Sequence, residues 1–172
     1  MTVFIETVRR LSQLCGLVSA ALLLAAVIVV CQLVVVRYAL RESAIWQHEF
    51  VTFALVGATL IGSPYVLLTR GHVNVDLLPT YLGPRGRLAL ALLASGLSLA
   101  FCLTIAVTGF IWWHEAWAGG WRGETVWAPR LWIPYLAMPV GIGLLSLQYL
   151  ADILALVTGR DLPFGLARKP PA

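Results

Sequence analysis

Three cysteines and three histidines are the side chains of this sequence with the widest range of chemistry. The cysteines are Cys15, Cys31 and Cys102, and each lies inside a long apolar run. A thiol–disulfide oxidase needs a reactive pair such as C-x-x-C, and the sequence contains no such pair. This spacing excludes a membrane disulfide oxidase of that kind.

The histidines raise the alternative of a haem protein, because imidazoles on neighbouring helices can hold the iron. His72 follows one apolar run and His114 ends another, so that the two are expected at opposite membrane faces, about 30 Å apart. His48 and His114 are expected at the same face. A small membrane electron carrier or enzyme that uses His48 and His114 as haem ligands is therefore the runner-up interpretation.

The elements that must position these residues are four stretches without any Asp, Glu, Lys or Arg, at residues 11–36, 50–69, 88–113 and 131–151. At about 1.5 Å per helical residue, each is long enough to cross a hydrocarbon core of about 30 Å. Overall, 60% of the residues are hydrophobic and 12% are charged. We predict an all-α integral membrane protein with four transmembrane helices and a single membrane domain over residues 1–172.

The first stretch has to be distinguished from a secretory signal peptide. Its 26 apolar residues exceed the roughly 7–15 of a signal-peptide core, so it is expected to stay as a membrane anchor. The connections between the stretches are too short for an ATPase, a dinucleotide-binding fold or a DNA-binding domain, and no nucleic-acid partner is expected.

None of the four stretches carries an ionisable residue. A protein that moves an ion or a proton by itself usually keeps such a residue near the middle of the membrane. Small multidrug antiporters depend on a membrane-embedded carboxylate, so this class does not fit the sequence. An autonomous channel is disfavoured for the same reason.

Basic residues are divided unequally between the two ends of the predicted spans. With the N-terminus in the cytoplasm, the inner segments hold eight Lys or Arg residues and the outer segments hold four. Cytoplasmic loops carry the excess of basic residues, so an N-in/C-in topology is favoured. All seven tryptophans then fall at or beyond the outer ends of spans: Trp46, Trp112, Trp113, Trp117, Trp121, Trp127 and Trp132.

Small residues recur at helical spacing in two spans, at Ala54, Ala58 and Gly62 and again at Ala137 and Gly141. Such positions let helix backbones approach closely, so these faces are predicted to pack against other helices. Three prolines are expected to kink the helices: Pro64, Pro134 and Pro139.

Two short motifs flank the second span. The first is Arg37-Tyr38 followed by Trp46-Gln47-His48-Glu49. Its mixture of apolar and polar residues favours an interfacial helix that brings Arg37 near Glu49, with a solvated turn as the alternative. The second motif, Arg70-Gly71-His72-Val73-Asn74-Val75-Asp76, is either a capped helix end or a contact with a partner.

Further features of the sequence lie between and after these two motifs. Gly62 lies between them, Leu131 to Pro134 begins the last span as Leu-Trp-Ile-Pro, and Pro139, Gly141 and Leu147-Gln148 follow within that span. The ordered set resembles the small membrane (Q-type) subunit of tripartite ATP-independent periplasmic (TRAP) transporters. Residues that match the family pattern are expected to serve assembly: Arg37, Tyr38, Trp46, Glu49, Gly62, Gly71, His72 and Asp76.

The resemblance implies a noncatalytic scaffold in the cytoplasmic (inner) membrane of a bacterium or archaeon. Its partners would be a large TRAP membrane subunit, a periplasmic substrate-binding protein and the lipid bilayer. The complex would import an organic acid with a sodium gradient. The resemblance further implies that sodium and the substrate bind to the large subunit, so that no catalytic residue, substrate site, metal or cofactor is expected in this chain.

The predicted topology can be tested with reporter fusions. A reporter that works only in the cytoplasm should be active when fused after Arg168, because the C-terminus is expected inside the cell. A reporter that works only in the periplasm should be active near Gly120. The reverse activity pattern would show that the charge asymmetry has been misinterpreted.

Overall fold

The computed structural model describes residues 2–69 and 83–158, and within these ranges the chain is helical apart from its connections. The helices are α1 (Thr2–Tyr38), α2 (Gln47–Leu68), α4 (Pro84–Ala118), α5 (Trp132–Tyr135) and α6 (Ala137–Val157). Four segments are long and apolar enough to cross a membrane, and the last of them runs through α5 and α6. The prediction of an all-α membrane protein with four spans is confirmed.

Most of the helices extend beyond the uncharged stretches from which they were predicted. α1 begins at Thr2 rather than at residue 11, and α4 continues to Ala118 rather than ending at residue 113. On the exposed side of α1, Arg10 Nε donates to Glu6 Oε1 at 3.3 Å across one helical turn. A helix satisfies its own backbone groups in water as well as in lipid, so the charged residues do not end the helices.

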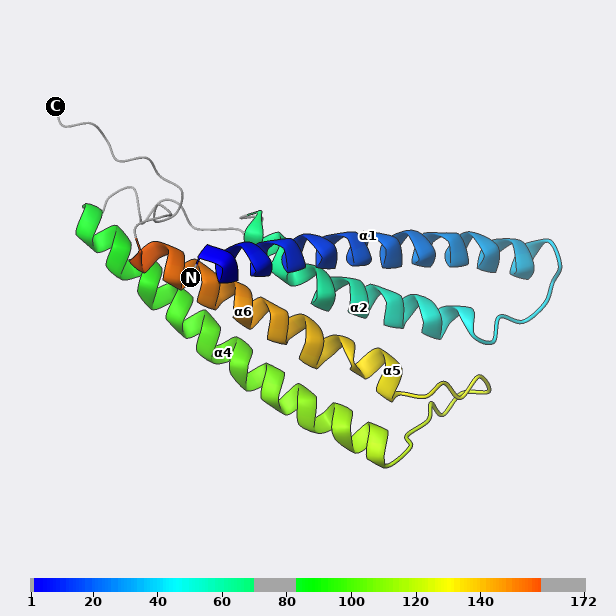
Figure 1. Cartoon of the computed structure of the whole chain (residues 1–172). Helices are drawn as coiled ribbons and strands as arrows, with labels where there is room; N and C mark the ends of the chain where they lie inside the picture. The colour runs from blue at the N-terminus through cyan, green and yellow to red at the C-terminus, as the bar shows by residue number, and fades with distance from the viewer. Residues whose placement is uncertain (1, 70–82, 159–172) are drawn as a thin grey trace.

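The long helices lie side by side in one layer, in the order α1, α2, α6 and α4 (Figure 1). α1 and α4 form the two edges of this layer, and the strongest contacts are those between neighbours. The start of α1 and the finish of α6 lie at one end of the layer. Connections 39–46 and 119–131 lie at the opposite end, which we call the loop end. Because the number of spans is even, the described chain starts and finishes at the same end of the layer.

Close packing between α1 and α2 depends on residues with small side chains. Ser19 on α1 donates a hydrogen bond of 2.7 Å to the carbonyl oxygen of Ala58 on α2. A methyl group on Gly62 would come within 2.6 Å of Ser19 Oγ, and one on Gly16 within 2.6 Å of the Tyr65 ring. The predicted packing face on α2 is therefore in contact with α1, as expected for small residues in membrane helices.

The contact between α2 and α6 is the closest of all, because it brings backbone against backbone. Gly141 of α6 is buried, and a Cβ atom there would collide with the carbonyl group of Leu60 on α2. On the other side of α6, Met138 packs over Gly109 of α4, where a Cβ atom would lie 2.9 Å from Met138 Cγ. Glycines thus set the spacing on both sides of α6.

A short chain of polar side chains joins α1 to α6 at the end opposite the loops. Ser12 on α1 donates a hydrogen bond of 2.8 Å to Oε1 of Gln148 on α6. Gln148 Nε2 in turn donates to Asp152 Oδ1 at 2.9 Å. Ser12 and Gln148 are buried, and hydrogen bonds of this type between membrane helices contribute about 0.6–2 kcal/mol each. This polar chain holds α1 and α6 together where they converge.

The three prolines expected to kink helices have different outcomes. Pro64 lies inside α2, which runs unbroken from Gln47 to Leu68. In the last span, Leu136 separates α5 from α6, and Pro134 lies within the short helix before this break. Pro139 has no backbone N–H and so cannot donate to the carbonyl of Tyr135, whereas the N–H of Val140 reaches the carbonyl of Leu136 at 3.2 Å. The missing donor accounts for the break, at which the backbone of Leu136 stays in the right-handed helical region.

The predicted interfacial helix between the first two spans is wrong. Residues 39–46 form turns, bends and coil between α1 and α2. Arg41 has a positive φ of 57°, a left-handed conformation that cannot continue a right-handed helix. Of the two conformations considered for this segment, the turn is the observed one.

Gly141 provides a test of the packing between α2 and α6, with Gly143 of the same helix as the control. Gly141→Ala places a methyl group against the backbone of Leu60, whereas no other atom lies within 4 Å of a Cβ at Gly143. We expect Gly141→Ala to cost about 1–3 kcal/mol of stability through overpacking. Gly143→Ala should be neutral or stabilising by about 0.5–1 kcal/mol, because alanine favours helix. Thermal unfolding in detergent measures both, and equal midpoints would contradict the close contact.

Candidate functional site

The assembly residues predicted from the sequence are distributed over several places in the structure. Arg37 and Tyr38 lie in the last turn of α1 and are exposed. Trp46 precedes the first residue of α2, and Glu49 lies in the first turn of that helix. Gly62 is a packing position against α1. The remaining three lie outside the described residues: Gly71, His72 and Asp76.

Arg37 and Glu49 were expected to approach each other, and the structure contradicts this. Within residues 2–69 and 83–158, neither side chain makes an ion pair. The expectation depended on a flat helix between them, and residues 39–46 instead form irregular coil. Arg37 is left exposed at the end of α1.

Glu49 is half-buried and its carboxylate is incompletely satisfied. Its Oε2 atom is buried and accepts no hydrogen bond from residues 2–69 or 83–158. The side chain lines a cavity of about 650 Å³ together with Arg122, Glu124 and Tyr135, which come from connection 119–131 and from α5. A buried carboxylate oxygen without a donor is costly, so Glu49 is suited to accept a hydrogen bond or an ion pair from another molecule.

The connection 119–131 folds back on itself at the loop end. Arg122 and Arg130 form an isolated antiparallel bridge, and the two residues face each other without exchanging hydrogen bonds of their own. In such a pair, both side chains stand on the same face and lie close together. The flanking bonds run from the N–H of Gly123 to the carbonyl of Pro129 (2.9 Å) and from the N–H of Leu131 to the carbonyl of Trp121 (3.0 Å).

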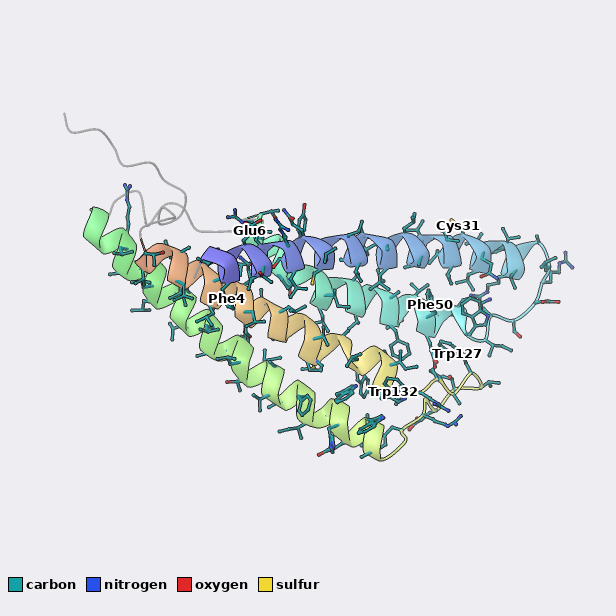
Figure 2. All side chains as sticks on the ribbon, viewed as in Figure 1. Phe4, Glu6, Cys31, Phe50, Trp127 and Trp132 are labelled. Carbon is teal, nitrogen blue, oxygen red and sulfur yellow. The ribbon has the colours of Figure 1, made fainter. Side chains whose placement is uncertain are left out.

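Aromatic contacts attach this connection to the start of α2. The ring of Trp46 lies 6.0 Å from that of Phe50 and 6.3 Å from that of Trp127, measured between centroids. Figure 2 shows Phe50 and Trp127 at the loop end, below the last turns of α1. Trp46 was predicted as an assembly residue, and Trp127 was one of the loop tryptophans expected at the outer side. The structure brings them together as one cluster.

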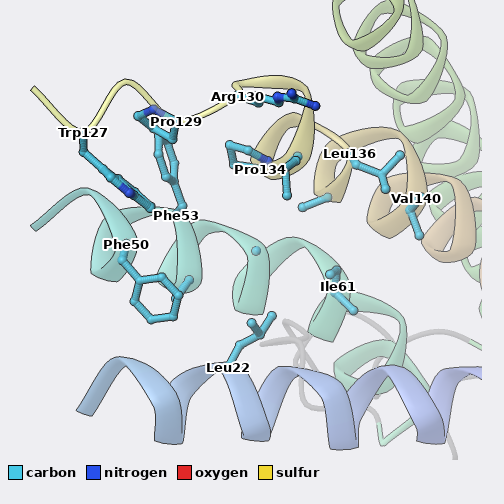
Figure 3. A pocket seen from close by; sticks show the side chains of 14 residues that line it. Leu22, Phe50, Phe53, Ile61, Trp127, Pro129, Arg130, Pro134, Leu136 and Val140 are labelled. Atoms are coloured by element: carbon cyan, nitrogen blue, oxygen red, sulfur yellow. The ribbon is translucent and has the colours of Figure 1, made fainter. Parts of the chain in front are cut away.

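An apolar groove lies beside this cluster, between α2 and the last span (Figure 3). Its volume is about 570 Å³. Leu22 of α1 borders it at one side, Phe50 and Ile61 lie along α2, and Val140 lies on α6. Arg130 stands near Pro134 at the loop end of the groove. The sequence did not predict this groove. It did predict that the prolines beside the groove kink a helix and that the small residues beside it pack closely.

A second aromatic cluster covers the last turns of α4. His114 packs against Phe110 and Trp117 of its own helix, with ring centroids 6.5 Å and 6.1 Å apart. α6 lies between α4, which carries His114, and α2, which carries His48. The two histidines are thus on helices that both pack on a third helix, and the geometry gives the haem interpretation no support.

The membrane-crossing parts of the described helices hold few groups that could do chemistry. Between Arg10 and Arg37, α1 has no ionisable side chain other than its cysteines, and on α6 the single carboxylate is Asp152, which is engaged by Gln148. No group of three or more His, Cys, Asp or Glu side chains gathers where it could hold a metal ion in the part of the chain that the structure describes.

Comparisons with known proteins relate the chain to components of transporters. The model of a family described as tripartite ATP-independent periplasmic transporters, DctQ component, matches residues 26–159. A Vibrio cholerae protein named C4-dicarboxylate TRAP transporter small permease protein DctQ is 26% identical over 148 residues. The alignment covers 74% of this chain and 64% of that relative, so the chain spans less than two thirds of the relative's length. No solved structure matches the chain.

Proposed function

Because the chain belongs to the DctQ component family of tripartite ATP-independent periplasmic transporters, we propose that it pairs with a large membrane subunit as its noncatalytic scaffold. The family is a transporter component of the inner membrane and not an enzyme. The proposed complex imports an organic acid that a periplasmic binding protein delivers, and it is driven by a sodium gradient.

The single open layer of helices is the observation that carries this proposal. α1 and α4 lie at opposite edges, so the helices do not close around a central path. Large apolar side chains remain exposed along both edge helices, for example Leu17 at 69% and Leu24 at 62% on α1 and Phe101 at 68% on α4. A layer of this form offers wide apolar faces to lipid and to a second membrane protein.

The ligands for sodium and for the substrate carboxylate are proposed to lie on the large subunit. Sodium binding in a membrane needs several oxygen ligands, typically at broken helices. The hydroxyl groups of Thr59, Thr104 and Thr108 instead donate to carbonyls of their own helices. Ser12 and Ser19 are engaged between helices. These polar groups already have structural partners, which supports assigning the transport chemistry to another polypeptide.

Transport by the chain alone is the direct test of this proposal. Reconstituted into liposomes without a large subunit, the chain is expected to show no sodium-dependent uptake of an organic acid. Uptake should appear when the large subunit and the binding protein encoded with it are added. Measurable sodium-dependent uptake by the verified chain alone would overturn the scaffold assignment.

Glu49 is expected to contribute to assembly with the large subunit. Its buried Oε2 atom has no donor among the described residues, so we propose that a cationic or N–H group of the large subunit supplies one. Removing one partner of a buried ion pair costs about 3–5 kcal/mol. Glu49→Ala should therefore lower co-purification of the large subunit by at least about tenfold.

The matched control for this prediction is Glu115→Ala, because Glu115 is exposed in the last turns of α4. Glu124→Ala is a second comparison, since this residue is exposed and lines the same cavity as Glu49. Both variants are expected to retain more of the large subunit than Glu49→Ala does. Equal recovery with all three variants would show that Glu49 is an ordinary surface charge.

A further inference from the structure

The apolar groove at the loop end is open along one side. Ile133, Leu136 and Val140 line it, and each also has an exposed side chain, at 57%, 38% and 41%. These residues belong to the membrane-spanning segment that runs from Trp132 to Val157. A groove with an exposed apolar rim in such a segment faces the hydrocarbon of the bilayer, so an apolar chain can enter it from the side.

The groove lies within one leaflet. The span begins at Trp132, and Val140 lies eight residues further along it. At about 1.5 Å per helical residue, this distance is about 12 Å, less than half of a hydrocarbon core of about 30 Å. The groove therefore lies in the outer part of the membrane, next to Arg130 before the span.

The volume of the groove is suited to a small molecule or a single lipid chain. The groove holds about 570 Å³, which is within the usual range of roughly 300–1,000 Å³ for sites that bind small molecules.

Positive charge at the groove comes from Arg130. Among the described residues that line the groove, Arg130 alone is charged. Arg122, which faces Arg130 across the antiparallel bridge, lines the neighbouring cavity together with the carboxylates of Glu49 and Glu124. The Arg130 guanidinium makes no ion pair or side-chain hydrogen bond within residues 2–69 and 83–158. An anion at the groove would satisfy its donors.

We propose that this groove binds one acyl chain of an anionic phospholipid, whose headgroup phosphate is held by Arg130. The guanidinium fork matches phosphate oxygens in a bidentate geometry. The acyl chain fills the space between α2 and α6 on the loop-end side of their contact at Gly141. The bound lipid thereby holds the segment 119–131 against the helical layer. This contact is at the loop end, where the Trp46 and Trp127 rings also meet.

The charge component of this proposal is tested with Arg130→Gln. The full chain is reconstituted in nanodiscs of equal parts phosphatidylglycerol and phosphatidylcholine, and the retained lipids are counted by native mass spectrometry. The wild type should retain phosphatidylglycerol in preference to phosphatidylcholine. Arg130→Gln should reduce that preference about fivefold, the change expected for one basic residue at a membrane surface. Arg41→Gln, which changes an exposed arginine outside the groove, is the control and should retain the preference.

The groove itself is tested with Val140→Trp, which places a large ring at its exposed rim. This variant should lose retained phospholipid of both kinds. Leu147→Trp is the control, because Leu147 is similarly exposed at 39% on the same helix but does not line the groove. Equal retention by the wild type and by both Arg130→Gln and Val140→Trp would overturn the proposal. Loss of the lipid on binding of the large subunit would also overturn the proposal, because a protein surface would then occupy the groove.

Discussion

The contact between Gly141 and the backbone of Leu60 is the constraint on which the rest of the structure depends. It joins α2 to α6 at the centre of a four-helix layer, where a single methyl group would force the two backbones apart. α1 contacts the rest of the layer mainly through α2, and α4 contacts it mainly through α6. The position of both edge helices and the width of the apolar groove follow from this one close approach.

The two ends of the layer are held by different forces. At the end opposite the loops, the hydrogen-bonded chain from Ser12 through Gln148 joins α1 to α6. At the loop end, the contact is aromatic and apolar, and it includes Trp46 and Trp127. Apolar contacts impose less directional constraint than hydrogen bonds. The loop end is therefore the end at which a partner or a lipid can be accommodated with little loss of protein–protein hydrogen bonding.

The predictions from the sequence succeeded where a single helix decides the outcome. The four spans follow from uncharged stretches, because lipid forces the backbone to satisfy itself locally. The break before α6 follows from Pro139, whereas α2 continues through Pro64. The expected helix between the first two spans failed, since its apolar pattern is short and Arg41 adopts a left-handed conformation. The expected pairing of Arg37 with Glu49 failed with it. The resemblance to TRAP small subunits agreed with the family that the chain matches.

By itself, the sequence determined that the chain crosses the membrane four times, that it lacks an ionisable group at mid-membrane, and which glycines and alanines permit close packing. Only the tertiary structure decided that the helices form an open layer in the order α1, α2, α6, α4, and that Glu49 keeps a buried oxygen without a donor. It also brought Arg130 to the mouth of an apolar groove. The physical reason is range: hydropathy and backbone hydrogen bonding act within one helix, whereas helix order and cavities depend on contacts between residues far apart in the chain.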